Sequence, residues 1–400
     1  MTRTLILLLA AGAALFHLFS AGVSPLTALV QRPIHLAFMA CLGFLGLGAR
    51  IRRSGARRHG EAREVGEAPA EADSVKGGEP AGQDEGAHDL DLEPHSGGLG
   101  SRSWPGLLVT GFLILAVLFT SLYLVSQHEA LVRRAGSPTT LDLVGGLLAL
   151  LVVLELARRT TGWGLVVVAL LALVYAVAGP YLPGFLAHRG YGFTRLMEHL
   201  YLSTEGIWGV PLGVSADFVY LFVLFGALLD MAGGGALLIG LADRATGRTR
   251  GGPAKTAALA SALMGSLSGS AVANVVTTGT FTIPLMRRSG FQPFFAGAIE
   301  AAASTGGQLM PPVMGAGAFI LATWTNIPYP QVAVAAIVPA VLYYVALLMA
   351  IHFRAGRMGL EGGRQQSREP VLPRLHLLLP LGFIVLLLAM GRSPMRAAFW

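Results

Sequence analysis

The sequence predicts an all-α polytopic membrane protein with about eight transmembrane spans, a re-entrant hairpin and a discontinuous helix. Of the 400 residues, 54% are hydrophobic and 13% are charged, whereas a soluble domain carries about 25% charged residues. Long apolar runs alternate with short clusters of arginine, which is typical of a multi-pass protein that keeps its basic loops in the cytoplasm. Two further apolar segments, 256–286 and 292–324, are interrupted near the middle by small and polar residues.

The composition also argues against several other functions. The net charge of +7 comes from basic residues between apolar spans, so it indicates membrane topology and no nucleic-acid partner. Cys41 is the only cysteine, which excludes internal disulfides and cysteine-based metal sites. The stretch Gly251–Thr256 fails as a phosphate loop, because Ala254 and Thr249 stand where that motif needs glycine. We therefore expect no ATPase subunit, no enzyme activity and no cofactor, which leaves a carrier driven by an ion gradient.

The first 58 residues hold two predicted spans, over 5–20 and 34–48. Five arginines follow the second span and place its end, and therefore the N-terminus, in the cytoplasm. These are Arg50, Arg52, Arg53, Arg57 and Arg58. A signal peptide over 5–20 is the alternative, which the later spans and the lack of a clear A-x-A site disfavour. Residues 59–103 are acidic and poor in large apolar side chains, which predicts a disordered cytoplasmic linker, or alternatively a regulatory or docking segment.

The remaining spans are placed by their apolar length and by the charges at their ends. They cover 105–125, 141–157, 162–180, 214–232, 331–351 and 375–390. Glu155 precedes Arg158 and Arg159 by three and four positions, which predicts an ion pair at a helix end. Residues 185–212 mix charged and apolar side chains, and we expect an interfacial amphipathic helix and a loop there.

The two interrupted segments differ in the charges beside them. Basic residues stand on both sides of 256–286, which predicts a re-entrant hairpin with its tip at Ser266–Ser270. The segment 292–324 is expected to cross the membrane, with a break at Ser304–Gln308 that the Pro311–Pro312 pair closes. Freed carbonyl and hydroxyl oxygens at such breaks can hold a cation, while helix N-termini face an anion. The alternative is that Gly, Ser and Ala merely let the helices pack closely.

The candidate ion- and substrate-binding residues lie at these two breaks and on the adjoining helices. They are Ser266, Ser268, Gly269, Ser270, Asn274, Thr278, Glu300, Ser304, Thr305, Gly306, Gly307, Gln308, Pro311 and Pro312. One helical turn places Asn274 and Thr278 on a single face of the second hairpin arm. Glu300 is expected to take a proton, to help hold a cation, or to cap a buried network with the hairpin hydroxyls. A supporting role is favoured for it.

The run GSLSGSAVANVVTTGTFTIPLMRRSGF, followed by EAAASTGGQLMPPVMGAGAFI, resembles the membrane component of tripartite ATP-independent periplasmic (TRAP) transporters. The similarity is greatest to fused permeases of the TAXI class, in which the small and large membrane subunits form one polypeptide. The resemblance implies an elevator-type, sodium-coupled carrier in the bacterial inner membrane. It also implies a periplasmic TAXI-type solute-binding protein that delivers an organic acid, and sodium ions bound near Ser268, Ser270, Asn274 and Gly306.

The same resemblance divides the chain into two parts. Residues 1–58 and 104–160, on either side of the acidic linker, look like a small subunit, and 161–400 looks like the N-terminal half of a large subunit. Family members carry a second, inverted copy of the hairpin and broken helix, so we expect a truncated permease, the first half of an inverted-repeat transporter. The nearest alternative is an ion-coupled anion carrier that needs no binding protein. The other is a membrane fragment or assembly subunit without transport activity.

Overall fold

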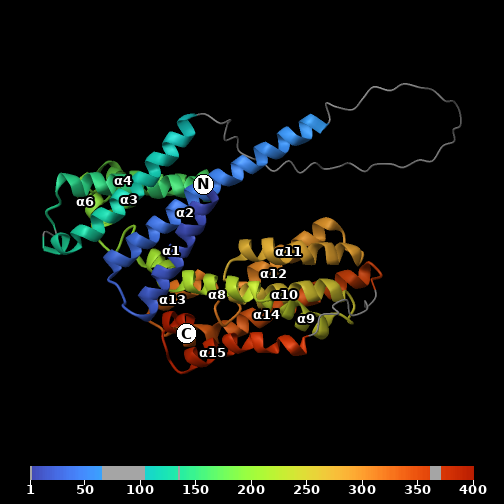
Figure 1. Ribbon diagram of the computed structural model, residues 1–400. Coiled ribbons are helices and arrows are strands. Elements are labelled where there is room, and N and C mark those ends of the chain that lie inside the picture. The colour runs from blue at the N-terminus through green and yellow to red at the C-terminus, as the bar shows by residue number, and fades with distance from the viewer. Residues whose placement is uncertain (1, 65–103, 134–135, 361–370) are drawn as a thin grey trace, which may run out of the picture.

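The computed structural model describes residues 2–64, 104–133, 136–360 and 371–400, and its regular elements there are helices (Figure 1). Among the described residues, seven helical stretches are long and apolar enough to cross a membrane. They are Arg3–Gly22, Ala28–Gly46, Leu108–Leu131, Thr140–Thr161, Trp163–Tyr181, Val210–Met231 and Tyr329–Arg357. Each coincides with one of the eight predicted spans, which confirms the all-α polytopic fold class.

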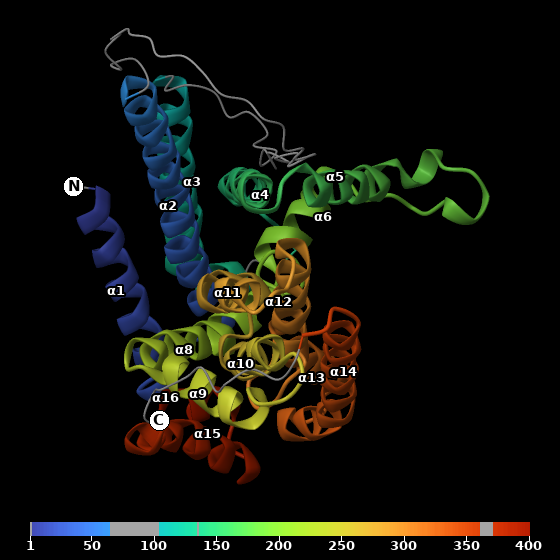
Figure 2. The same ribbon diagram turned by 90° about the vertical axis from the view of Figure 1, so that its right-hand side faces the viewer.

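Within the described residues, the N-terminal part of the fold is built from five helices. Their bounds are α1 (Thr2–Gly22), α2 (Ala28–Glu64), α3 (Trp104–Arg133), α4 (Thr140–Thr161) and α5 (Trp163–Ala178). α2 and α3 lie side by side (Figures 1 and 2), and Phe44, Val117 and Leu124 are buried in the core that they share. The linker predicted over 59–103 lies outside the described residues, except that α2 extends to Glu64.

Both ends of α4 are fixed by local hydrogen bonds. At its start, the Thr139 hydroxyl and the Asp142 carboxylate form a capping box with each other's backbone amides. At its end, Glu155 accepts from the Nε atoms of Arg158 and Arg159, each at 2.7 Å. This arrangement confirms the predicted helix-end ion pair and places cationic side chains where the helix dipole favours them.

The connection from α5 to α8 consists of short helical segments. They are 3₁₀ turns at Gly179–Tyr181 and Gly184–Leu186, α6 (Phe193–Met197), a π-helical turn at Glu198–Leu202, α7 (Val210–Val214) and a second π-helical turn at Ser215–Val219. The amphipathic helix predicted within 185–212 is therefore restricted to 193–202. Tyr201 and Trp208 are fully buried against α2, α3 and α4. This part of the connection packs into the core because its aromatic side chains complete the apolar cluster between those helices.

The C-terminal part is a bundle around α10. Its helices are α8 (Tyr220–Met231), α9 (Gly234–Thr246), α10 (Gly252–Ser268), α11 (Ala271–Arg288), α12 (Pro293–Gly307), α13 (Ala316–Thr325) and α14 (Tyr329–Arg357). α10 packs against α9, α11, α12 and α14 (Figure 2). Its buried alanines, among them Ala257, Ala258 and Ala262, let these neighbours approach closely. The sequence analysis missed α9, which is shorter than a membrane span and begins with glycines.

The span predicted over 375–390 does not form one α-helix of span length. The chain there forms a 3₁₀ helix, Leu372–Leu378, followed by α15 (Leu379–Ala389) and α16 (Pro394–Phe399). The 3₁₀ helix runs directly into α15, and their seven and 11 residues together measure roughly 30 Å at about 2.0 and 1.5 Å each, which is about the thickness of the hydrocarbon core. Pro373 and Pro380 lack the amide donors of a continuous α-helix, which explains why an apolar run of this length changes helix type.

Candidate functional site

The segment 256–286 turns back on itself between two helices. α10 ends at Ser268, Gly269 adopts a left-handed conformation with φ of 62°, and the Ser270 hydroxyl caps the first turn of α11. A Cβ atom on Gly269 would lie 2.5 Å from the carbonyl oxygen of Met314. Glycine therefore meets two requirements here, the backbone angle and the close approach of another loop.

The second interrupted segment unwinds slightly later than predicted. The non-helical stretch between α12 and α13 is 308–315, so most of the predicted break, Ser304–Gln308, forms the last turn of α12. The helix continues until the prolines approach, and the Pro311–Pro312 bond is cis. The amide of Val313 donates to the carbonyl oxygen of Ser266 at 3.3 Å. The two interruptions are therefore in direct contact.

α10 and α12 cross backbone to backbone beside this contact. A Cβ atom on Gly265 would lie 2.7 Å from the Cα atom of Gly307, and the reverse distance is the same. This is the close packing of small residues that the sequence analysis gave as the alternative use of these glycines. The close crossing also brings the polar side chains of both helices within hydrogen-bond range of each other.

A buried carboxylate occupies the centre of the polar side chains between α10, α11 and α12. Glu300 is 0% exposed. Thr282 donates to its Oε2 atom at 2.6 Å, and Thr278 donates to Oε1. Ser261 and Ser304 also reach Oε1, each at 3.2 Å. Within the part of the chain that the structure describes, no basic side chain is in ion-pair distance of Glu300. Hydroxyl dipoles therefore stabilise this group in place of a salt bridge.

Asn274 connects the hairpin to α12 through its amide. Its Nδ2 atom donates to the carbonyl and the hydroxyl of Ser261, both at 2.8 Å, and to the hydroxyl of Ser304 at 3.2 Å. Its Oδ1 atom is buried and has no hydrogen-bond partner. An unpaired buried acceptor is costly unless another group or an ion satisfies it. We refer to Ser261, Asn274, Thr278, Thr282, Glu300 and Ser304 as the Glu300 cluster.

The structure sorts the candidate site residues into three groups. Asn274, Thr278, Glu300 and Ser304 belong to the Glu300 cluster. The second group forms the hairpin tip and comprises Ser266, Ser268, Gly269 and Ser270, of which the Ser268 hydroxyl is buried without a hydrogen-bond partner. The third group lies at the end of α12 and in the loop after it, and comprises Thr305, Gly306, Gly307, Gln308, Pro311 and Pro312. Thr305 and Gln308 in that group are exposed, so they are accessible to a ligand.

Two members of the Glu300 cluster were absent from the sequence prediction. Thr282 follows Asn274 and Thr278 at the same four-residue spacing, so helical periodicity could have found it. Ser261 lies within an alanine-rich helix and belongs to neither interruption, and only the packing of α10 on α12 shows that it faces Glu300.

α14 supports the interrupted segment at three points that the sequence analysis also missed. The Tyr343 hydroxyl donates to the Ala302 carbonyl at 2.8 Å, and the Tyr344 hydroxyl donates to the Ala303 carbonyl at 2.6 Å. The Tyr329 hydroxyl, at the other end of the break, donates to the Pro312 carbonyl at 2.9 Å. Hydrogen bonds from one helix therefore fix both the last turn of α12 and the loop that follows it.

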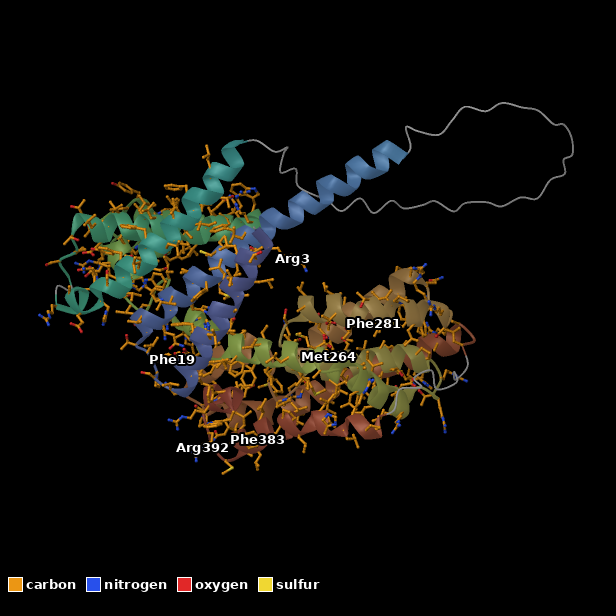
Figure 3. All side chains as sticks on the ribbon, viewed as in Figure 1. Arg3, Phe19, Met264, Phe281, Phe383 and Arg392 are labelled. Atoms are coloured by element: carbon orange, nitrogen blue, oxygen red, sulfur yellow. The ribbon has the colours of Figure 1, made fainter. Side chains whose placement is uncertain are left out.

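A cavity of about 670 Å³ adjoins the cluster between α9 and α11. Thr278 and Thr282 line it while also donating to Glu300. Met264 and Phe281, which are labelled in Figure 3, contribute to its apolar wall. One layer of threonine side chains thus separates the buried carboxylate from a space large enough for a small organic molecule.

These features define a polytopic α-helical membrane protein in which two interrupted helices meet beside a buried polar cluster. Residues 148–400 match the family model described as the DctM component of the tripartite ATP-independent periplasmic transporter. Because this match covers well over half of the sequence, the chain belongs to that family. The protein is therefore membrane-embedded, and its family consists of transport components rather than enzymes.

Individual relatives cover shorter parts of the chain. The uncharacterised protein y4mL of Sinorhizobium fredii is 31% identical over 202 residues, which cover 46% of this chain and 47% of that protein. The C4-dicarboxylate TRAP transporter large permease protein DctM of Pseudomonas aeruginosa is 33% identical over 156 residues, 39% of this chain and 34% of the relative. The isethionate TRAP transporter permease protein DctMQ of Oleidesulfovibrio alaskensis is 28% identical over 141 residues, 35% of this chain and 22% of the relative. Each match spans less than half of the relative's length.

Proposed function

We propose that this chain is the permease part of a TRAP transporter that takes up an organic acid together with sodium ions. The observation that carries the proposal is the contact between the two interrupted helices, where the Val313 amide meets the Ser266 carbonyl beside the Glu300 cluster. Interrupted helices at membrane depth supply carbonyl oxygens and helix ends for ions. Membership of the DctM family supports a transport role for such a site.

Sodium is the proposed coupling ion. A small hard cation takes oxygen ligands, and the Ser268 hydroxyl and Asn274 Oδ1 are buried oxygens without hydrogen-bond partners. We propose that these two atoms, with oxygens of Ser270 and Gly306, bind the ion. Glu300 plays the supporting role in this proposal, because its hydrogen bonds fix the helices that carry the ligands.

The proposed substrate is a small organic anion. The printed names of two relatives refer to a C4-dicarboxylate and to isethionate, both of which are organic acids. The exposed side chains of Thr305 and Gln308 are the proposed substrate contacts. The carbonyl of Gln308 accepts from the Gly315 amide at 2.8 Å, so Gln308 lies at the start of α13, and the N-terminal end of a helix favours negative charge.

The proposal extends to the organisation of the transporter. We propose that 1–58 and 104–160 correspond to a fused small subunit, and that the protein is of the TAXI class and works with a periplasmic solute-binding protein. The family match begins at residue 148, so most of the small-subunit-like part precedes it. The inner membrane, with a cytoplasmic N-terminus, is the proposed location, which the arginine cluster after the second span supports.

Sodium binding and solute uptake provide separate tests. Equilibrium binding of ²²Na⁺ to the purified chain is expected to be displaced by unlabelled Na⁺ and not by K⁺ or choline. Equal competition by K⁺ would contradict a sodium site. In proteoliposomes supplied with a solute-binding protein encoded beside this gene, uptake of radiolabelled succinate is expected to require an inward sodium gradient. Uptake that continues without the binding protein would favour the carrier that needs none.

A further inference from the structure

A second cavity, of about 360 Å³ and with a mainly apolar lining, lies between the α9–α10 corner and the C-terminal end of α14. Its polar lining consists of Thr246, Thr249, Lys255 and His352. It is separate from the Glu300 cluster, and the proposed function does not use it. It contains the lysine of the stretch that fails as a phosphate loop.

The backbone of that stretch forms a tight corner against α14. The Gly252 amide donates to the Thr249 carbonyl at 2.7 Å, and Gly251 has a φ of 67°. A Cβ atom on Gly251 would lie 2.8 Å from the Cβ atom of Ala355, so the corner is pressed against α14. The Lys255 side chain, one turn into α10, consequently lies beside the last turns of α14.

The ammonium group of Lys255 is buried among neutral groups. The residue is 9% exposed, and its Nζ atom contacts Thr249 Oγ1 at 3.3 Å and His352 Nδ1 at 3.1 Å. The Thr249 hydroxyl donates to the Thr246 carbonyl at 2.7 Å, so it accepts from the lysine. No carboxylate among the described residues is in ion-pair distance of Lys255. Of its three N–H donors, these contacts occupy two, which leaves one for a ligand.

The surroundings favour an anionic ligand. Burial, with the Arg250 guanidinium as the second cause, lowers the pKa of Lys255, so a bound anion would stabilise the ammonium form. Exposed arginines at the same end of the bundle add positive potential. They are Arg244, Arg248, Arg250 and Arg357. Only two of the 29 lysine and arginine residues of the chain are lysines. The buried position 255 nevertheless holds lysine, whose ammonium group is more compact than a guanidinium.

The depth of the cavity and its apolar wall suit a lipid. The 29 residues of α14 measure roughly 43 Å at about 1.5 Å each, which exceeds the hydrocarbon core of about 30 Å by roughly two and a half helical turns. His352 is five residues from the end of α14, so it lies near the level of the headgroups. Met349 and Phe353, which are 53% and 63% exposed, line the same cavity beside the polar groups.

We propose that this cavity binds an anionic phospholipid. The phosphate accepts a hydrogen bond from the remaining N–H donor of Lys255, and an acyl chain lies along Met349 and Phe353. Basic pockets between transmembrane helices on the cytoplasmic side are suited to anionic headgroups. A lipid bound here joins the α9–α10 corner to α14 and stabilises their contact. A free phosphate ion has the same headgroup chemistry, but it leaves the apolar wall without a partner.

The test is the thermal stability of the detergent-purified full chain, titrated with dioctanoyl phosphatidylglycerol, dioctanoyl phosphatidylcholine or inorganic phosphate. Phosphatidylglycerol is expected to raise Tm in a saturable way, while the other two leave it unchanged. Lys255→Gln is expected to weaken the phosphatidylglycerol effect by about tenfold in apparent Kd, equivalent to about 1.4 kcal/mol. The control is Arg392→Gln, which removes one exposed charge at a distant site (labelled in Figure 3) and is expected to leave Kd unchanged.

Several outcomes would overturn the proposal. Equal stabilisation by phosphatidylcholine would show that the charge is not recognised, and equal stabilisation by inorganic phosphate would show a simple anion site. An unchanged Kd in Lys255→Gln would place the lipid elsewhere. Should that variant not fold, Thr249→Val keeps the charge and removes the hydroxyl that accepts from Lys255 Nζ and positions it, and an unchanged Kd in it would count against the site. The measurement involves no transport, so its failure is distinct from failure of the proposed function.

Discussion

Gly265 of α10 and Gly307 of α12 approach so closely that a Cβ atom on either would lie 2.7 Å from the Cα atom of the other. The same turn of α10 contacts Asn274, whose Nδ2 atom would be 3.2 Å from a Cβ atom on Gly265. The crossing of the two helices and the position of the Glu300 cluster therefore depend on glycine at both positions, because any other residue would add a Cβ atom there.

Gly265→Ala is expected to destabilise the protein, because the added methyl group meets backbone atoms that cannot move independently. Overpacking of this kind costs about 1–3 kcal/mol, which should appear as a lower Tm of the purified protein. Gly297→Ala in α12 is the matched control, since its Cβ atom would meet nothing within 4 Å. The control is expected to be neutral or stabilising by about 0.5–1 kcal/mol. Equal Tm values for the two variants would contradict the close crossing.

Glu300→Ala is expected to lower the Tm of the protein, because it weakens the packing of the helical hairpin on α12. The substitution removes the acceptor of four hydroxyl groups and leaves buried donors with poorer partners, at a cost of about 2–4 kcal/mol. Glu300→Gln keeps the shape and one carbonyl oxygen, so its Tm is expected to lie between those of Glu300→Ala and the unmodified protein. Glu205→Ala serves as the control, because Glu205 is exposed. A Glu300→Ala protein as stable as this control would mean that the network contributes little.

Asn274→Ala is expected to weaken sodium binding, because it removes a buried oxygen that has no protein partner. The expected loss is on the order of tenfold in Kd, or about 1.4 kcal/mol, measured by ²²Na⁺ binding. Ser268→Ala tests the second unpaired oxygen in the same way. Thr280→Ala is the control, since Thr280 is exposed and its hydroxyl bonds only to its own helix at 2.8 Å. Unchanged sodium affinity in both test variants would argue against a cation site at the hairpin.

Tyr344→Phe is expected to loosen the last turn of α12, because the carbonyl of Ala303 loses a hydroxyl donor at 2.6 Å. The expected cost is about 1 kcal/mol, with faster amide hydrogen exchange at the end of α12. Tyr175→Phe is the control, as its exposed hydroxyl makes a longer bond, at 3.4 Å, to Leu186. Exchange that is equally slow in both variants would show that the tyrosine is not needed to hold the turn.

Topology can be tested by labelling single cysteines in a background that lacks Cys41. The basic flanks of the hairpin predict that Ser289→Cys reacts with a membrane-impermeant maleimide only from the cytoplasmic side. With a cytoplasmic N-terminus, the loop between the predicted spans 105–125 and 141–157 is expected to lie outside, so Ser137→Cys in that loop should be labelled only from outside and serves as the control. Labelling of position 289 from outside would exclude a re-entrant arrangement for 256–286.

Local sequence was sufficient to predict the long helices, the turn of the hairpin and the buried carboxylate. Apolar length and arginine clusters predicted the helices that the structure contains at span length, and the glycine and serine content of 266–270 placed the turn between α10 and α11. Glu300 was found because a carboxylate in an apolar segment is rare. The Pro311–Pro312 pair, whose peptide bond is cis, lies in the non-helical stretch between α12 and α13, and the sequence predicted that it ends the break.

Features that depend on packing between distant segments were not predictable in this way. Ser261 and Tyr344 are common residue types, and their roles arise from partners 39 and 41 positions away. The change of helix type within 375–390 was missed for a different reason, since hydrophobicity is the same for α- and 3₁₀-helical residues and only the two prolines distinguish them. The break in 292–324 was placed too early, because serine, threonine and glycine are tolerated in the last turn of a helix.

The tyrosines of α14 have a mechanical consequence. Tyr329 is hydrogen-bonded to the loop after α12, while Tyr343 and Tyr344 are hydrogen-bonded to the final turn of α12 itself. Hydrogen bonds from α14 therefore hold α12 and the loop that connects it to α13. A displacement of the loop that keeps these hydrogen bonds carries all 29 residues of α14 along. A crosslink from α14 to α12 is therefore expected to leave such a displacement intact.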